Sequence, residues 1–378
     1  MNFALSDEQV LLREAARDAL SRIPTLEAAR KALDGEPLPD LWPTAVAAGW
    51  PGLLIPEERG GAGLDVFDAM LVLGECGRAL APIPLLGHLP ATAILAAAAA
   101  EGIDELASGD RRAAYLPTRP PGDLVHGWTV DPHSGEARPA APRAAIDGDT
   151  ATVDGELWWV LDAPGADVLV GVAVTAGGTP VGVAVDADQP GVTVEPVKGY
   201  DATRSLGHVA LSGAKATALS VHEDELAAAW YLAQALLAAE SVGSVEVALD
   251  VSVAYAKDRH TFGRAIGSYQ AIKHGLTEVL RRLENARSLC YYAGWSRRGA
   301  PDEFALAASG ARSSAGGALD FGSREMIAVH GGIGATWEHD APLFFRRAQL
   351  SRRLLGGDAD ATDRVATELL READAAAA

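Results

Sequence analysis

The chain has little of what marks a secreted, metal-binding or membrane protein. Its 378 residues include only two cysteines, Cys76 and Cys290, which form neither a metal-binding spacing nor a disulfide framework. The N-terminus lacks a basic segment followed by an apolar run, so it does not read as a secretion signal. The Ala-rich run at residues 91–100 is too short to span a membrane and is followed at once by Glu101. We therefore expect a globular, cytoplasmic protein.

Basic side chains are also scarce. The chain has 32 lysines and arginines against 51 aspartates and glutamates, a formal net charge of −19. Such a surface repels nucleic acid and anionic membranes, so neither is expected as a partner. Any anionic ligand must then be held by a local basic pocket. With 48% hydrophobic residues the chain has enough apolar material for more than one core, and its length suggests two or three domains.

The texture of the sequence changes twice. Up to about residue 106 it reads as helices broken by turns, and Ser6 with Gln9 forms a capping-box pattern that opens the first helix. Short runs rich in Val, Ala and Thr then predict a compact antiparallel β domain. These runs are residues 151–153, 157–161, 168–174, 181–185, 192–197 and 208–211. From about residue 223 long helical patterns return, so we predict domains at residues 1–112, 113–222 and 223–378.

One apolar seam marks the C-terminal helices. Its members follow one another at alternating spacings of three and four residues: Tyr269, Ile272, Leu276, Val279, Leu283, Ala286 and Cys290. This spacing places them on one face of a helix, as a helix bundle requires. We interpret the seam as core packing, and the fold class as mainly α with a β middle domain.

Residues 255–274, YAKDRHTFGRAIGSYQAIKH, carry the most chemistry. They bring a cation (Arg259), a hydroxyl (Thr261), an aromatic plane (Phe262) and an amide (Gln270) to one helix junction. Such groups can hold a large anionic cofactor with a flat ring. The alternative is a helix–loop–helix turn with polar surface residues. The segment resembles the signature of the acyl-CoA dehydrogenase family, which is built around FAD. That resemblance implies that these residues contact the FAD of a neighbouring subunit across a tetramer interface.

A second motif is the glycine-rich run at residues 329–340, VHGGIGATWEHD. Gly331 and Gly332 let backbone amides approach a ligand without obstruction by a Cβ, although a lone glycine-rich turn is more often a tight loop. The run resembles the family's C-terminal glycine motif, which touches the FAD pyrophosphate. Ala328 stands where the family often has a glutamine. We interpret Glu338 and His339 as structural.

The middle region offers two further cofactor candidates. Trp158 and Trp159 are adjacent in a predicted strand, so they point to opposite faces and only one can line a site. The family resemblance favours Trp159, near the isoalloxazine. It also places Thr118 at the threonine of the family's flavin-contacting Thr-Glu-Pro strand, with Arg119 in place of the usual acid. Asp201, Thr203 and Arg204 resemble a turn of the family that we interpret as structural.

The proton-abstracting base is harder to place. In the family a glutamate occupies either a loop after the glycine motif or the first long C-terminal helix, and the resemblance puts Leu354–Leu355 and Ala233 at these positions. Glu240 lies on nearly the same helix face as Ala233, in an apolar run where a carboxylate is costly unless paired or functional. Apolar surroundings also raise carboxyl pKa values toward those of catalytic groups. Glu240 is therefore the candidate base, with Asp358 and Asp360 as alternatives. The competing interpretation is that Glu240 pairs with another side chain of the bundle.

The resemblance implies a fold with an N-terminal helical domain, a β barrel or sandwich, and a C-terminal four-helix bundle. It implies FAD-dependent α,β-dehydrogenation of an acyl-CoA, with electrons passed to an electron-transferring flavoprotein. The assembly would be a homotetramer, or a heterotetramer with a related subunit. Two alternatives stay open. The chain could be a non-catalytic subunit that completes a partner's flavin site, or a flavin-dependent monooxygenase or oxidase on the same fold.

Overall fold

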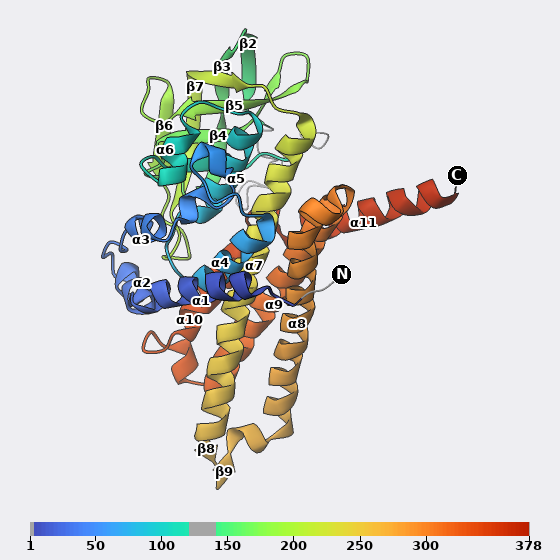
Figure 1. The fold of residues 1–378 in the computed structure, drawn as a ribbon. Coiled ribbons are helices and arrows are strands. Elements are labelled where there is room, and N and C mark those ends of the chain that lie inside the picture. The colour runs from blue at the N-terminus through green and yellow to red at the C-terminus, as the bar shows by residue number, and fades with distance from the viewer. Residues whose placement is uncertain (1–3, 121–140, 378) are drawn as a thin grey trace.

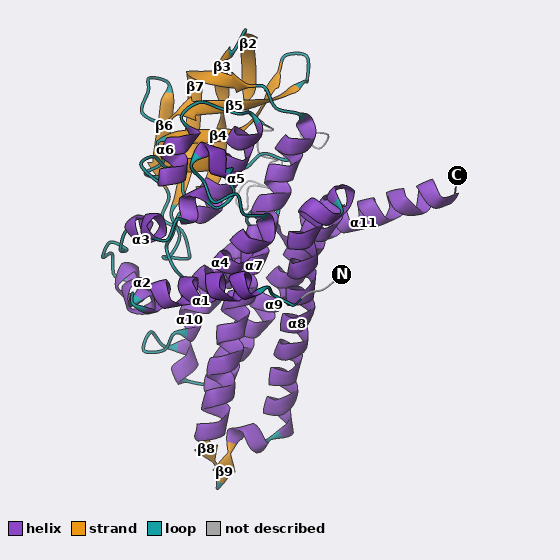
Figure 2. Cartoon of the chain, viewed as in Figure 1, coloured by secondary structure: helices purple, strands orange, loops and turns teal. Residues whose placement is uncertain are grey.

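The computed structural model describes residues 4–120 and 141–377. Helices occupy both ends of the chain and a β region lies between them (Figure 2). The first helix is α1, and its predicted capping box is confirmed, because the Gln9 backbone N–H donates to Ser6 Oγ and the Ser6 N–H to Gln9 Oε1. The N-terminal helices are α1 (Asp7–Ser21), α2 (Thr25–Leu33), α3 (Trp42–Ala47), α4 (Val66–Arg78), α5 (Leu85–Ala97) and α6 (Ile103–Ser108).

The middle of the chain forms one sheet. Its strands are β1 (Ala113–Leu116), β2 (Arg143–Asp147), β3 (Thr150–Leu161), β4 (Val168–Thr175), β5 (Pro180–Asp186), β6 (Val192–Pro196) and β7 (Leu206–Leu219). Among the described residues the order is β1-β4-β2-β3-β7-β5, with β6 paired to β7. The expectation of a purely antiparallel domain is wrong in part, because β4 runs parallel to both β1 and β2. Residues 121–140 of the predicted middle domain lie outside the described residues.

The C-terminal helices are α7 (Glu223–Asp258), α8 (Gln270–Gly299), α9 (Phe304–His330), α10 (Ala341–Ser351) and α11 (Gly357–Ala377). A small hairpin of β8 (His260–Thr261) and β9 (Arg264–Ala265) joins α7 to α8 at the end of the molecule opposite the sheet (Figure 1). The predicted seam is buried from Val279 to Cys290, while Ile272 and Leu276 near the hairpin are half-buried. Short 3₁₀ helices lie at Trp50–Gly52, Glu57–Arg59, Ile266–Ser268, Pro301–Glu303 and Ile333–Ala335.

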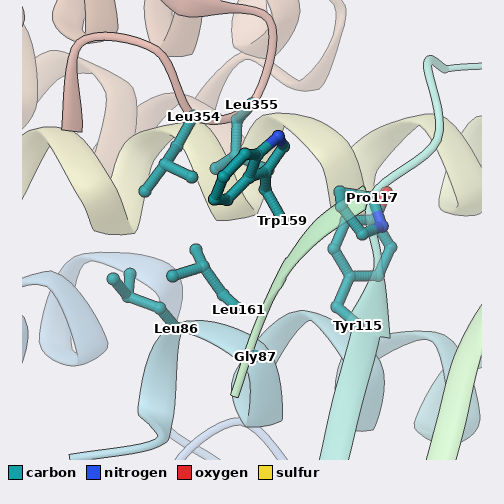
Figure 3. A pocket seen from close by; sticks show the side chains of 8 residues that line it. All are labelled: Leu86, Gly87, Tyr115, Pro117, Trp159, Leu161, Leu354 and Leu355. Carbon is teal, nitrogen blue, oxygen red and sulfur yellow. The ribbon is translucent and has the colours of Figure 1, made fainter. Parts of the chain in front are cut away.

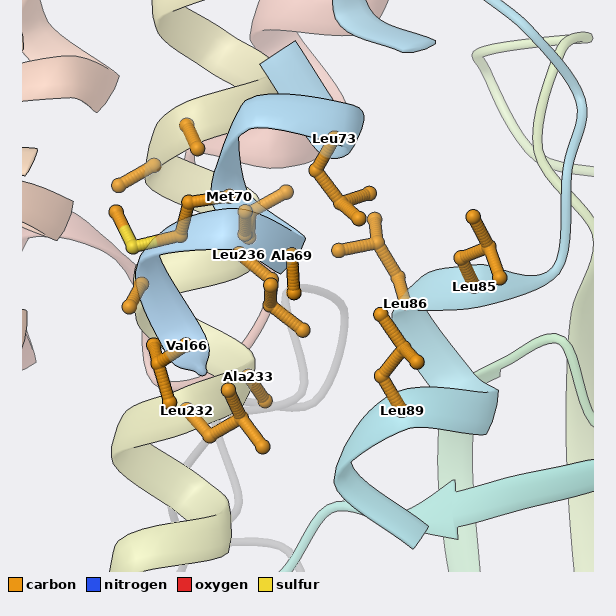
Figure 4. Close-up of a cluster of buried hydrophobic side chains, with 14 of the residues drawn as sticks. Val66, Ala69, Met70, Leu73, Leu85, Leu86, Leu89, Leu232, Ala233 and Leu236 are labelled. Atoms are coloured by element: carbon orange, nitrogen blue, oxygen red, sulfur yellow. The ribbon is translucent and has the colours of Figure 1, made fainter. Parts of the chain in front are cut away.

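The core lies where α4 and α5 pack on the first half of α7. Figure 4 shows their side chains filling this space, with Met70 and Leu73 from α4, Leu86 and Leu89 from α5, and Leu236 from α7. One buried cluster runs from α1 through the sheet to the C-terminal bundle, so the division into three domains stays a prediction. Within residues 4–120 and 141–377, none of the helices is both long enough and apolar enough to cross a membrane.

Candidate functional site

A small apolar cavity lies where the sheet, α5 and the loop before α11 meet (Figure 3). Its volume is about 10 Å³, the room of roughly one water molecule. It is lined by Leu86, Gly87, Tyr115, Pro117, Trp159, Leu161, Leu354 and Leu355. None of these described lining residues carries a carboxylate.

Strand β3 presents Trp159 to this cavity through an irregular backbone. The pairing of β3 with β7 shifts register between Leu157 and Val160, and Trp159 has a positive φ of 59°. The bulge re-aims the side chain, as such bulges commonly do beside sites. Trp158 instead is 39% exposed and stacks on His208. Of the two tryptophans, Trp159 is therefore the one that lines this cavity, and its role toward a flavin stays a prediction.

The two positions where the family would carry its base adjoin one another. Ala233 on α7 is buried, and so are Leu354 and Leu355 in the loop. Gln234, the residue after Ala233, donates from Nε2 to the Leu355 carbonyl at 3.1 Å. Neither alanine nor leucine can accept a proton, so neither of these described positions supplies a base.

Glu240 is buried but its carboxylate is fully engaged. Arg347 donates from Nη1 to Glu240 Oε1 at 2.8 Å, and Arg204 donates to Glu240 Oε2. Arg347 also holds Asp201 at 2.6 Å and bonds the Thr203 hydroxyl. Although burial alone would raise it, these guanidinium groups hold the pKa of Asp201 below its usual value. This geometry speaks for the competing interpretation of Glu240 as a paired structural group, and it extends the structural role expected of Asp201 and Arg204.

The two alternative carboxylates are paired as well. Asp358 accepts from Nη1 of Arg312 at 2.8 Å, and Arg312 is fully buried. Burial raises the pKa of Asp358 against the effect of Arg312. Asp360 lies 2.5 Å from Nη2 of Arg119, the residue that replaces the family's acid. All three carboxylates proposed as a base thus face an arginine.

Thr118 lies at the same end of the molecule, just after β1. Its side chain is 3% exposed, and its Oγ1 has no hydrogen-bond partner among the described residues. In that same part of the chain, the buried hydroxyl of Tyr115, a residue of the cavity wall, has none either. Buried polar atoms of this kind call for an unseen partner such as water or a ligand. These two orphan hydroxyls are compatible with a cofactor on this side of the sheet.

The cofactor motif of residues 259–270 lies far from this cavity. At about 1.5 Å per residue, the end of α7 at Asp258 is some 37 Å from Ala233. Phe262 sits at the tip of the β8–β9 hairpin, 96% exposed and with a positive φ of 51°. Thr261 is half-buried, Gln270 begins α8 and is exposed, and Arg259 is exposed without an ion-pair partner among the described residues. The motif thus presents its cation, ring and amide outward.

The glycine loop lies beside the same end of α7. His330, the last residue of α9, stacks on Tyr255 of α7 with ring centroids 4.3 Å apart. Gly331 has φ 62° and ψ −135°, a backbone conformation that requires glycine. A Cβ at Gly331 or Gly332 would meet no atom of this chain within 4 Å. The loop and the hairpin therefore share one end of the bundle and leave open space for a ligand or a neighbouring chain.

Comparison with known proteins identifies the family and supports the fold. The family described as acyl-CoA dehydrogenase, N-terminal domain, matches residues 6–119, and the acyl-CoA dehydrogenase, C-terminal domain, matches residues 230–370. The acyl-CoA dehydrogenase IpdE2 of Mycolicibacterium smegmatis is 33% identical over 97% of this chain and 100% of its own. In the ChsE4–ChsE5 complex from Mycobacterium tuberculosis, one chain superposes with a TM-score of 0.84 at 25% identity, over 98% of this chain and 99% of that one. Butyryl-CoA dehydrogenase from Megasphaera elsdenii shares the fold, with a TM-score of 0.84 at 20% identity over 98% and 100% of the two chains.

Proposed function

Because the chain belongs to the acyl-CoA dehydrogenase family of oxidoreductases, we propose that it serves FAD-dependent α,β-dehydrogenation of an acyl-CoA as the subunit without a base, completing the flavin site of a partner chain. One observation carries the proposal. The two base positions, Ala233 and Leu354–Leu355, are both buried, are linked through the Gln234–Leu355 hydrogen bond, and carry no carboxylate among the described residues. A general base must reach the proton it removes, and no free carboxylate of this site does so.

The open end of the bundle supports the cofactor half of the proposal. Arg259 offers a guanidinium that has no ion-pair partner in residues 4–120 and 141–377, and such a group can bind pyrophosphate oxygens through charge-assisted hydrogen bonds. Phe262 offers an exposed ring, and the space beside Gly331 and Gly332 admits a ligand to the backbone. When bound, FAD supplies the acceptor for the hydride that leaves the substrate. The hairpin and the glycine loop would hold that FAD from outside the partner's β region.

The assembly in this proposal is a heterotetramer with a related chain that carries the base. The ChsE4–ChsE5 relative is a complex of two different chains, which supports such an arrangement. Acyl-CoA would bind with its acyl group near the partner's base, and an electron-transferring flavoprotein would receive the electrons. Within this chain, the ion pairs of Glu240 would fix the first half of α7 rather than move protons.

The test compares the chain alone with the chain co-expressed with a related subunit that has a glutamate at a base position. We expect the chain alone to leave FAD absorbance unchanged when mixed anaerobically with acyl-CoA, and the pair to bleach. Arg259→Ala in this chain should lower the flavin content of the pair. Bleaching by the chain alone would contradict the proposal. Oxygen consumption without bleaching would favour a monooxygenase or oxidase instead.

A further inference from the structure

A second, larger cleft shares no lining residue with the apolar cavity. Its volume is about 910 Å³, within the range of roughly 300–1,000 Å³ typical of ligand pockets. Three segments far apart in the sequence form its walls. They are residues 30–38 at the end of α2, residues 197–204 between β6 and β7, and Trp337 with Arg346 near α10. Neither the cavity nor the hairpin motif includes these walls.

The cleft gathers basic side chains in a chain that has few. Its lining includes four cationic residues, Arg30, Lys198, Arg204 and Arg346, within a protein of net charge −19. Three acids also line it, Asp34, Glu36 and Asp201, and Asp201 is bonded by Arg347 at 2.6 Å. Arg30 is likewise paired with Asp340, and Arg204 with Glu240. Lys198 and Arg346 form no ion pair among the described residues, so they are the cations of the cleft that remain for an anion.

Two of these arginines have donors that lack acceptors. The side chain of Arg204 is only 5% exposed, and its Nη2 is bonded to Glu240 and Ser351. Its buried Nε has no hydrogen-bond acceptor among the described residues, with Asp201 Oδ2 3.8 Å away, and the buried Nε of Arg30, whose Nη2 pairs with Asp340, has none there either. Buried guanidinium groups are normally satisfied, so an orphan donor points to a missing anion or water. Both orphan donors belong to residues of the cleft wall.

The rim supplies flat surfaces as well as charge. Tyr200 is 51% exposed and Trp337 is 54% exposed. The guanidinium of Arg346 lies between them, 4.3 Å from the Tyr200 ring centroid and 5.0 Å from that of Trp337. Its Nη1 donates to the Tyr200 carbonyl at 2.6 Å, which fixes its plane. Exposed aromatic faces beside a cation favour a ligand that has both a ring and negative charge.

We propose that this cleft binds a phosphorylated nucleotide. Lys198, Arg346 and the arginines of the wall hold the phosphate groups, and the exposed face of Trp337 or Tyr200 stacks on the base. A free nucleotide and the nucleotide end of coenzyme A share this chemistry. The inference rests on the cleft alone and is independent of the chain's role toward a partner's flavin.

The purified assembly is titrated with ADP, coenzyme A and inorganic phosphate, by calorimetry and by tryptophan fluorescence. We expect ADP or coenzyme A to bind, and Lys198→Glu to weaken binding about tenfold or more by removing one charged contact. Lys215→Glu, at an exposed lysine on β7 away from the cleft, makes the same charge change and should leave affinity nearly unaltered. Trp337→Ala should weaken nucleotide binding but not phosphate binding, while Trp295→Ala on α8 should change neither.

Each result of these titrations either supports or overturns the proposed nucleotide site. Tighter binding of ADP than of coenzyme A assigns the site to free nucleotides, and the reverse order assigns it to coenzyme A. Either order supports the proposal when Lys198→Glu weakens that binding and Lys215→Glu does not. Equal binding of phosphate and nucleotide, unaffected by Trp337→Ala, would reduce the cleft to a simple anion site and overturn it. So would the absence of binding, or equal losses in Lys198→Glu and Lys215→Glu. Lys198 is exposed, so circular dichroism should show both lysine variants folded.

Discussion

The two halves of helix α7 differ in what they bury and what they present. In the first half almost every residue from Leu226 to Val245 is buried, and the one carboxylate of this stretch, Glu240, is held by two arginines. The far end has mostly exposed or half-buried residues and leads into a hairpin with Phe262 at its tip. The first half of α7 is enclosed, but its carboxylate is already bound by arginines. The far end carries an exposed cation and an exposed ring, but nothing encloses them.

This difference separates two roles that a single active site usually combines. A base must be unpaired and near its substrate, and the first half of α7 offers no such group. A cofactor anchor needs donors that are not yet satisfied, and Arg259 is one. The contrast favours a chain that contributes to a neighbour's site. The predictions that follow test each side of the contrast.

The largest effect is expected from Arg347→Met, which leaves Asp201 and Glu240 with Arg204 alone as a shared partner. Breaking a buried ion pair on one side typically costs about 3–5 kcal/mol. We expect a loss of this size in the free energy of unfolding, measured by urea denaturation. The matched control is Arg353→Met, because Arg353 is exposed and bonds only the Gln349 carbonyl among the described residues. It should cost less than about 0.5 kcal/mol.

Glu240→Gln probes the same cluster from its acidic side and separates the two interpretations of that residue. If Glu240 is a paired structural group, the variant should have a clearly lower free energy of unfolding, because Arg204 and Arg347 lose a charge partner. If Glu240 is the base, the variant should unfold at the same free energy as the wild type, and its assembly should turn over about 10²–10⁴-fold more slowly. The second result would restore the sequence-based hypothesis and refute the contrast between the two halves of α7.

Leu354→Ala tests how firmly the apolar cavity is packed. Leu354 is 3% exposed, and truncating a buried leucine typically costs about 2–5 kcal/mol. We expect a loss in this range by urea denaturation. Leu370→Ala, at a leucine of α11 that is 66% exposed, should change stability by less than about 0.5 kcal/mol. A loss below about 1 kcal/mol for Leu354→Ala would mean that the cavity can collapse or open at little cost.

The features that sequence predicted well are local or periodic. The Ser6–Gln9 capping box and the Val279–Cys290 part of the seam depend on spacings of three and four residues, which one helix fixes by itself. The parallel pairings of β4 could not be predicted, because they join strands that are distant along the chain. A pattern of short β runs indicates strands, but it carries no information on their direction.

The site shows the same limit. Glu240 lies in an apolar run, which indicates burial but not what faces it across the helix packing. Its partners, Arg204 and Arg347, are 36 and 107 residues away in the sequence. The hairpin residues could be proposed because they lie close together in the sequence and resemble a family motif, and their cofactor role stays a prediction. The larger cleft, lined by Lys198 and Arg346, could not be predicted from the sequence, because its walls come from three separate segments.

At the open end, Arg259→Ala should lower the flavin content of the assembly about tenfold or more. A charged hydrogen bond to phosphate contributes roughly 1.5–3 kcal/mol. The free energy of unfolding should stay within about 0.5 kcal/mol of the wild type, because Arg259 is exposed. Arg281→Ala removes another exposed arginine, on α8, and should leave flavin content unchanged. Equal flavin content in the two variants would remove Arg259 from the cofactor site.

The smallest effect concerns Asp162, which lies beside the buried half of α7 and feels the charges of Arg204, Glu240 and Arg347. Its Oδ2 accepts the Gly87 N–H at 2.8 Å, and burial raises its pKa to about 7. The folded chain thus keeps a proton that the unfolded chain loses near pH 4. Between about pH 4 and pH 7 this group lowers the free energy of unfolding as pH rises, by at most about 1.4 kcal/mol per pH unit.

Asp162→Asn keeps an oxygen to accept the Gly87 N–H but cannot titrate. Urea denaturation at about pH 5 and pH 7 should therefore show a smaller loss of stability with rising pH in the variant than in the wild type. Asp167→Asn is the control, because Asp167 also accepts a backbone N–H, from Arg112 at 2.7 Å, but is exposed. It should follow the wild type. If Asp162→Asn did so too, Asp162 would titrate in the folded chain as it does in the unfolded one. The region beside the first half of α7 would then be better solvated than its packing implies, and the contrast with the exposed hairpin end would narrow.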